Sequence, residues 1–205
     1  MKFFCRSVIS IVVAVLSSQA SATSESELDE LYQKLRQVPI SYQTFGTVCE
    51  QIARIELIAE YPADKFEIVT GILYKGKDEQ GSYRTLGELD VVVLDKSDNE
   101  AIIIAEVKCW KDLDAARSKA RKQLKRFAHY MQISTNLTMY LTENIKRHFK
   151  MQQFDEQPKY LAVSQDDGKE HGFGMTIGVS LDEASALRDK LLSWQNRHPP
   201  TRQNP

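Results

Sequence analysis

Residues 87–108 read GELDVVVLDKSDNEAIIIAEVK, two apolar runs joined by a polar turn. The runs are short and rich in β-branched residues, so they predict two neighbouring strands, about 85–95 and 100–109. Their near-continuous apolar character is typical of strands that are covered on both faces. The stretch therefore predicts the centre of an α/β protein, with a central sheet flanked by helices.

Charged residues interrupt these two strands at matching places. Asp90 stands directly before Val91-Val92-Val93 in the first run, and Glu106 and Lys108 stand at the end of the second. Residues i and i+2 of a strand point to one face, so Glu106 and Lys108 share a side. Charges at the end of a buried strand are costly unless they are paired or bind a metal. Two carboxylates beside an ammonium group can hold Mg²⁺ and position a water for phosphodiester hydrolysis.

The remaining sequence predicts helices on both sides of this centre. The element order is α-α-β-β-β-α-β-α-β-β-α, a mixed central sheet flanked by helices in a single domain over residues 23–197. Residues 75–82 predict a loop, and residues 198–205 a disordered tail. Expected helices are 23–38, 44–60, 112–133, 143–152 and 182–195, and the other expected strands are 66–74, 138–141, 160–163 and 175–179.

The N-terminus has the pattern of a secretory signal peptide over residues 1–22. Lys2 and Arg6 precede an apolar run over residues 8–16, and Ala20-Ser21-Ala22 supplies small residues for cleavage. The apolar run is far below the roughly 20 residues that span a bilayer. We therefore expect an exported protein, periplasmic or secreted, with no stable membrane insertion after cleavage; an uncleaved anchor is the alternative.

Two cysteines, Cys49 and Cys109, remain after such cleavage. An oxidising compartment permits a disulfide between them, but two buried free thiols are the favoured expectation. The four histidines are scattered without zinc-ligand spacing, so a zinc site is not expected. The net charge of −1 offers no global attraction to phosphate, which would have to come from a local basic patch.

Over residues 46–127, a helix carries Glu50, two strands carry Asp90, Glu106 and Lys108, and a further helix carries Lys119 and Gln123. This set resembles the PD-(D/E)xK nuclease superfamily. The resemblance rests on the order helix, three strands, helix, and on a Gly46-x-x-x-Glu50 pattern in the first helix. Leu89 stands before the aspartate where the family name has proline. The resemblance implies a restriction-endonuclease-like αβββαβ core and a nuclease that uses Mg²⁺, with Mn²⁺ as a possible substitute. The residues that carry it are Glu50, Asp90, Glu106, Lys108, Lys119 and Gln123.

The resemblance also implies a role for each of these residues. Asp90 and Glu106, with the Val107 carbonyl, would hold the metal ion. Lys108 would orient the attacking water and offset charge on the phosphate. Glu50 would hold a metal-bound water or a second cation, and Gln123 would reach the site from the following helix. The alternatives are a chance pattern in charged strands, a solvated Glu50, and a Glu88 that forms a salt bridge instead of serving as a third acid.

The helix after the Glu-x-Lys strand is strongly basic. Arg117, Arg121 and Lys125 fall on one face at intervals of four, with Lys119 nearby, and we expect these four residues to bind substrate. A solvated helix face is the alternative. Trp110, two residues beyond Lys108, could stack on a base, but capping of the core is the favoured expectation.

The sequence thus predicts a metal-dependent nuclease that acts on nucleic acid, DNA rather than RNA. The alternative is a non-catalytic module that binds nucleic acid or protein and retains this fold. A structural protein with an accidental match is the third reading. Strand preference and oligomeric state stay open at this point.

Overall fold

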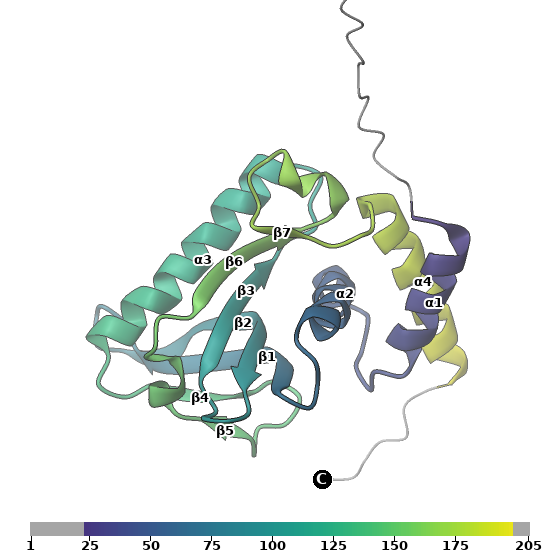
Figure 1. Ribbon diagram of the computed structural model, residues 1–205. Coiled ribbons are helices and arrows are strands. Elements are labelled where there is room, and N and C mark those ends of the chain that lie inside the picture. Colours follow the sequence, from purple (N-terminus) through teal and green to yellow (C-terminus); the bar gives the residue numbers. More distant parts are fainter. Residues whose placement is uncertain (1–22, 199–205) are drawn as a thin grey trace, which may run out of the picture.

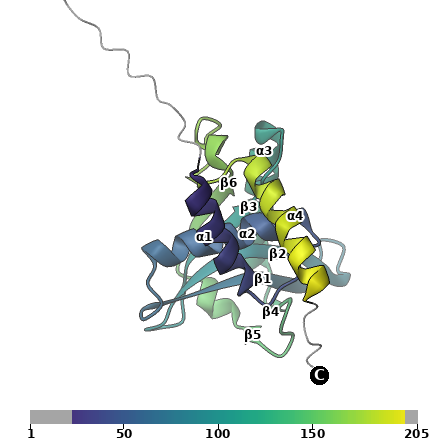
Figure 2. The same cartoon turned by 90° about the vertical axis from the view of Figure 1, so that its right-hand side faces the viewer.

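The computed structural model describes residues 23–198, which form a mixed sheet with helices on both faces (Figure 1). Helix α3 covers one face of the sheet, α2 covers the other, and α1 and α4 pack side by side outside α2 (Figures 1 and 2). The elements are α1 (Glu25–Arg36), α2 (Phe45–Glu60), β1 (Phe66–Lys77), β2 (Tyr83–Asp95), β3 (Ala101–Val107), α3 (Leu113–Ile133), β4 (Thr138–Leu141), β5 (His148–Phe149), β6 (Lys159–Ser164), β7 (Met175–Thr176) and α4 (Leu181–Arg197), with short 3-10 turns η1 (Met151–Phe154) and η2 (Asp166–Lys169).

The described part of the chain builds one seven-stranded sheet in the order β5-β4-β1-β2-β3-β6-β7. Strands β1, β2 and β3 are antiparallel neighbours, whereas β6 lies parallel to β3 and β7 parallel to β6. The α/β class and the mixed central sheet flanked by helices are therefore confirmed. The predicted bounds of α2, α3 and β4 agree with the structure to within one residue.

The alternation of strand side chains divides the core into two. Val91 and Val107 point toward α2 and join one apolar cluster. Val92 and Ile104, the alternate residues, join a second cluster on the α3 side. Both sides of β2 and β3 are thus buried, as the near-continuous apolar runs indicate.

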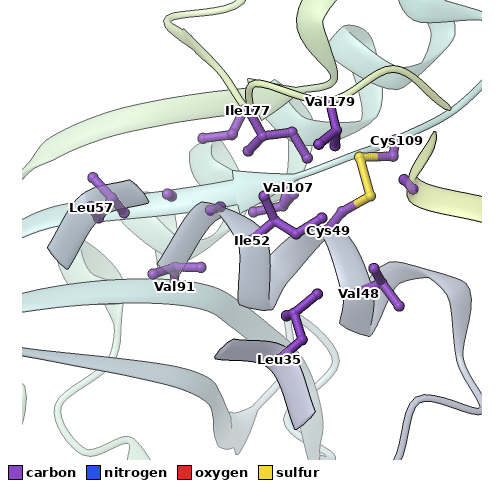
Figure 3. Packing of buried hydrophobic residues seen from close by; sticks show 14 of the residues in the cluster. Leu35, Val48, Cys49, Ile52, Leu57, Val91, Val107, Cys109, Ile177 and Val179 are labelled. Carbon is purple, nitrogen blue, oxygen red and sulfur yellow. A yellow bond between two sulfur atoms is a disulfide. The ribbon is translucent and has the colours of Figure 1, made fainter. Parts of the chain in front are cut away.

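The expectation of free thiols is wrong. Cys49 of α2 and Cys109, just beyond β3, form a disulfide inside the first cluster (Figure 3). Their Cα atoms lie 6.5 Å apart, within the usual range for a disulfide. The two cysteines meet because α2 packs against the end of β3, and their spacing along the sequence does not reveal this contact.

The helix expected over residues 143–152 is also wrong. This segment turns back as β5, where Phe149 pairs with Met139 of β4, and then forms the short turn η1. Arg147 makes a bidentate ion pair with Glu67 of β1 at 2.6 and 2.7 Å. Strand pairing and this ion pair stabilise the hairpin over an isolated helix.

The loop expected over residues 75–82 is shorter than the sequence indicated. Strand β1 continues to Lys77, and the turn is closed by Asp78, whose Oδ1 accepts backbone hydrogen bonds from Gln80 and Ser82. Gly76 lies so close to Leu137 that a Cβ would sit 2.7 Å from its side chain. The last expected strand, 175–179, is limited to Met175–Thr176.

The expected signal peptide, and all of the expected tail except His198, lie outside the described residues. Over residues 23–198, no helix combines the length and the apolar character that crossing a membrane requires.

Candidate functional site

Acidic side chains from the interior of β2 and the end of β3 meet at one ammonium group. The antiparallel register pairs Val91 with Ala105, which brings Asp90 level with Glu106 at the next position. Lys108 Nζ then lies 2.8 Å from Asp90 Oδ2, 3.2 Å from Glu106 Oε2 and 3.0 Å from the Val107 carbonyl oxygen. The backbone N–H of Val107 donates to Asp90 Oδ2 at 2.8 Å and fixes that carboxylate. The three groups expected to hold a metal ion therefore all face one cation, the Lys108 ammonium.

This cluster is buried deeply. Glu106 is 0% exposed, Asp90 is 7% exposed, and the Lys108 side chain is 13% exposed. Glu106 Oε1 is buried and has no hydrogen-bond partner among the described residues. Burial and then the Asp90 carboxylate raise the pKa of Glu106 above its usual range, although Lys108 opposes this. Burial opposes the charge on Lys108, but Asp90 and Glu106 outweigh it, so the pKa of Lys108 is raised.

Helix α2 brings Glu50 to the same cluster. Burial raises the pKa of Glu50, and the Asp90 and Glu88 carboxylates raise it further, while Lys108 lowers it. Glu50 is half-buried on α2, so it is not a fully solvated helix charge. A Cβ at Gly46 would lie 3.3 Å from Glu50 Oε1, so the glycine leaves room for this carboxyl group.

Two other expected polar residues are placed differently. Glu88 accepts a hydrogen bond from Thr142 Oγ1 at 3.0 Å, beside Gly71, and is not bonded to the Lys108 ammonium. Gln123 is half-buried on α3, and its Oε1 is buried without a hydrogen-bond partner among residues 23–198. The structure therefore shows no hydrogen bond that joins the Gln123 carbonyl to the cluster.

The oxygen donors of the cluster fit a hard divalent cation in their chemistry. Two carboxylates and a backbone carbonyl are the donor types that Mg²⁺ takes, and the unpartnered Glu106 Oε1 is a further donor. However, no group of three or more His, Cys, Asp or Glu side chains in the described part of the chain is arranged to hold a metal ion. Only two carboxylates, those of Asp90 and Glu106, are hydrogen-bonded to the Lys108 ammonium, which lies where the donors converge. A divalent ion and this ammonium would compete for the same oxygen atoms.

The basic face of α3 is partly used within the fold. Arg121 donates to the Gly172 carbonyl oxygen at 3.1 Å, and Arg117 lies 3.6 Å from Asp114. Lys119 and Lys125 are exposed. The expected substrate-binding face therefore combines exposed lysines with two arginines that already have partners within the fold.

Trp110 does not cap the core, contrary to expectation. Its side chain is 41% exposed, two residues beyond Lys108. Sequence reasoning could not separate these outcomes, because an apolar ring beside a strand end suits either one.

A separate cavity of about 670 Å³ lies between α2, β1 and the β4–β5 hairpin. Its lining includes Gln51, Arg54, Glu67 and Arg147, but no residue of the Asp90–Glu106–Lys108 cluster. The cavity and the cluster of buried charged groups therefore lie at different places in this fold. The perturbed and coupled charges favour the cluster as the candidate functional site.

Comparison with protein-family models, with curated proteins and with solved structures finds no match for this chain.

Proposed function

We propose that this chain is a divalent-metal-dependent nuclease that hydrolyses phosphodiester bonds at the Asp90–Glu106–Lys108 cluster. The observation that carries the proposal is the convergence of Asp90 Oδ2, Glu106 Oε2 and the Val107 carbonyl on a single cation, within 3.2 Å of Lys108 Nζ. Burying two acids and a lysine together is costly for stability alone, so such clusters are common at functional sites.

Each residue of the cluster has a distinct part in this proposal. Asp90, Glu106 and the Val107 carbonyl would hold a divalent ion, which would supply Lewis-acid polarisation of the phosphate when bound. Lys108, released from these oxygens, would orient water and offset the negative charge that develops on the phosphate. Glu50 would accept hydrogen bonds from water at the outer side of the site.

The arrangement of elements supports a restriction-endonuclease-like core as part of the same proposal. Helix α2, strands β1 to β3, helix α3 and strand β6 follow one another in the order αβββαβ, with β6 parallel to β3. On this interpretation, the β4–β5 hairpin is an addition at the β1 edge of the sheet. DNA is the expected substrate class and Mg²⁺ the expected ion, with Mn²⁺ as a substitute.

A non-catalytic binding module is the second candidate, and the ion pairs favour it. Lys108 already satisfies both carboxylates at 2.8 and 3.2 Å, and Glu106 is inaccessible to solvent. In such a module the cluster would have a purely structural role, and divalent ions would change neither the stability of the fold nor its binding of a partner.

The test is cleavage of plasmid, single-stranded DNA and RNA by the purified protein in Mg²⁺, Mn²⁺ or EDTA. Glu106→Gln preserves the size of the side chain and removes the anionic donor, so we expect the fold to survive and cleavage to be lost. Glu60→Gln, an exposed acid at the end of α2, makes the same charge change elsewhere and should cleave as the wild type does. Absence of divalent-dependent cleavage by the wild type would favour the binding module.

Export to an oxidising compartment belongs to the same proposal. The Cys49–Cys109 disulfide supports it, because reducing compartments keep such thiols unpaired. Fractionation of cells that express the whole chain tests this, since an exported protein would be recovered outside the cytoplasm in the disulfide-bonded form.

A further inference from the structure

Trp110 is an exposed aromatic residue beside the candidate site. Its side chain is 41% exposed, although most large apolar residues in residues 23–198 are buried. Its Cα can lie at most about 7 Å from that of Lys108, because only Cys109 lies between them along the chain. A single exposed apolar residue is ordinary on a protein surface, so exposure alone implies no function.

The backbone that carries this ring is anchored by two side-chain hydrogen bonds and a disulfide. Ser164 Oγ donates to the Lys108 carbonyl oxygen at 2.8 Å, and Gln165 Nε2 donates to the Trp110 carbonyl oxygen at 2.9 Å. Ser164 is 0% exposed and Gln165 is 2% exposed. Between these two anchored carbonyls, Cys109 is tied to α2 by its disulfide. Buried polar groups thus fix the chain on both sides of the ring, while Trp110 keeps 41% of its surface accessible to solvent.

Basic residues extend from the ring along the chain. Lys111 follows it directly and is exposed. Lys119 is exposed farther along α3. A flat apolar surface followed by exposed cationic side chains matches a nucleotide, which has a flat base and an anionic phosphate.

We propose that Trp110 is a stacking platform for an unpaired base of the strand that is cleaved beside it. This inference rests on the proposed nuclease function and narrows its substrate to nucleic acid that is single-stranded at the site. A base in a duplex already stacks on its neighbours, whereas an unpaired base has a free face. A ring on a fixed backbone loses little conformational entropy when a base stacks on it, so its free energy of stacking is retained.

The test measures binding in EDTA, so that no metal-dependent cleavage occurs. The ligands are a short single-stranded DNA, the same sequence as duplex, and the same sequence as single-stranded RNA. A Trp194→Phe background leaves Trp110 as the sole tryptophan fluorophore, since the chain has two tryptophans. We expect single strands to quench its fluorescence and duplex to leave it nearly unchanged. The DNA and RNA arms distinguish the two sources of an unpaired base.

Substitution at position 110 then measures what the ring contributes. Trp110→Ala should weaken single-strand binding about 5- to 150-fold, the equivalent of one stacked base. Trp110→Phe should retain most of the affinity, because a flat ring remains. Tyr83→Ala removes a 61% exposed ring at the start of β2, far along that strand from Asp90, and should bind as the wild type does.

The outcomes separate this inference from the nuclease proposal. Unchanged single-strand affinity in Trp110→Ala, or equal quenching by duplex, would overturn the stacking role even if cleavage in Mg²⁺ persists. If Trp110→Ala binds single strands more weakly and the wild type shows no cleavage in Mg²⁺ or Mn²⁺, the result would support the platform and count against the nuclease. A wild type that binds none of the ligands in EDTA would overturn the stacking role, and one that also cleaves none of them in Mg²⁺ or Mn²⁺ would overturn both.

Discussion

The disulfide between Cys49 and Cys109 joins the residue before Glu50 to the residue after Lys108. It therefore fastens α2 to the end of β3 at the point where these two elements supply the candidate site (Figure 3). Along the chain the two cysteines are 60 residues apart. The same covalent bond thus closes a long loop and fixes the position of Glu50 relative to the Glu106-x-Lys108 strand.

Loss of this disulfide should destabilise the protein by about 2–5 kcal/mol, because closing a long loop restricts the unfolded chain. We expect the Cys49→Ala/Cys109→Ala variant to unfold at lower denaturant concentration than the oxidised wild type. The measurement is urea unfolding with and without a dithiol reductant. Reductant should shift the wild type and leave the double variant unchanged. Equal midpoints for the oxidised wild type and the variant would show that the bond contributes nothing.

Removal of the Lys108 ammonium should make stability depend on divalent ions. Lys108→Met leaves Asp90 and Glu106 buried side by side without their shared cation, at a cost of about 3–5 kcal/mol. A bound Mg²⁺ or Mn²⁺ would replace that cation and would no longer compete with the ammonium for the same oxygen atoms. We therefore expect Mg²⁺ to raise the melting temperature of the variant more than that of the wild type.

In this variant the rate of cleavage should fall, while the increase in melting temperature caused by Mg²⁺ should become larger. Cleavage should fall on the order of 10²-fold or more, because the group that offsets phosphate charge is missing. Lys65→Met, an exposed lysine before β1, is the matched control and should respond to Mg²⁺ as the wild type does. A Lys108→Met protein whose melting temperature ignores Mg²⁺ and Mn²⁺ would argue that the cluster does not hold a divalent ion.

The Glu67–Arg147 ion pair should give the β4–β5 hairpin a pH-dependent contribution. Hydrogen bonds from Arg147 lower the pKa of Glu67 below its ordinary value. The stabilisation is therefore fully present above about pH 4.3, the usual pKa of glutamate, and is lost as the pH falls through the lowered pKa. Both side chains are about one-third exposed, at 35% and 38%, so solvent and salt reduce the effect.

Thermal unfolding of Glu67→Gln and the wild type at several pH values tests this contribution. The wild type should melt at the higher temperature near neutral pH, and the difference should vanish in acid. Added salt should reduce the difference at neutral pH. A difference that is independent of pH would mean that packing, not charge, holds Arg147 against β1.

The apolar pattern of the sequence was sufficient to predict the central strands of the sheet, but it was insufficient to predict the elements at the edges of the sheet. Strands β2 and β3 bury both faces, so their apolar runs identify them without knowledge of any neighbour. Residues 143–152 contain the helix-compatible pattern of a surface segment, and only pairing with β4 makes Phe149 part of a strand. Local preference is a weak guide wherever a tertiary interaction decides the outcome.

The candidate site shows the same division. The i, i+2 spacing correctly placed Glu106 and Lys108 on one side of β3, and the strand order brought Asp90 beside them. The position of the ammonium among all three oxygen donors depends on side-chain torsions, which no spacing encodes. The backbone position of Trp110 depends on Gln165, just beyond β6, which donates to the Trp110 carbonyl oxygen from 55 positions along the chain.

The basic face of α3 should contribute to nucleic-acid binding through charge, beyond its role within the fold. We expect Arg117→Gln/Arg121→Gln/Lys125→Gln to weaken binding of all sequences and to flatten its salt dependence. For each phosphate that is no longer neutralised, the slope of log affinity against log salt should fall by about 0.7 with single strands and about 0.9 with duplex. The total change should be smaller than that for three phosphates, because Arg121 also donates to Gly172 and Arg117 lies beside Asp114.

The measurement compares salt titrations of the Glu106→Gln parent with and without the three substitutions. A second triple variant, Lys65→Gln/Lys146→Gln/Lys150→Gln, removes the same charge from exposed positions away from α3 and controls for net charge. We expect the control to retain nearly the parental slope, since its lysines lie before β1 and around β5, whereas the slope of the α3 variant is reduced. Melting curves of both variants show whether removal of the Arg121–Gly172 hydrogen bond loosens the loop. Equal slopes for the two triple variants would mean that the α3 face is only solvated and that phosphates approach the cluster over another surface.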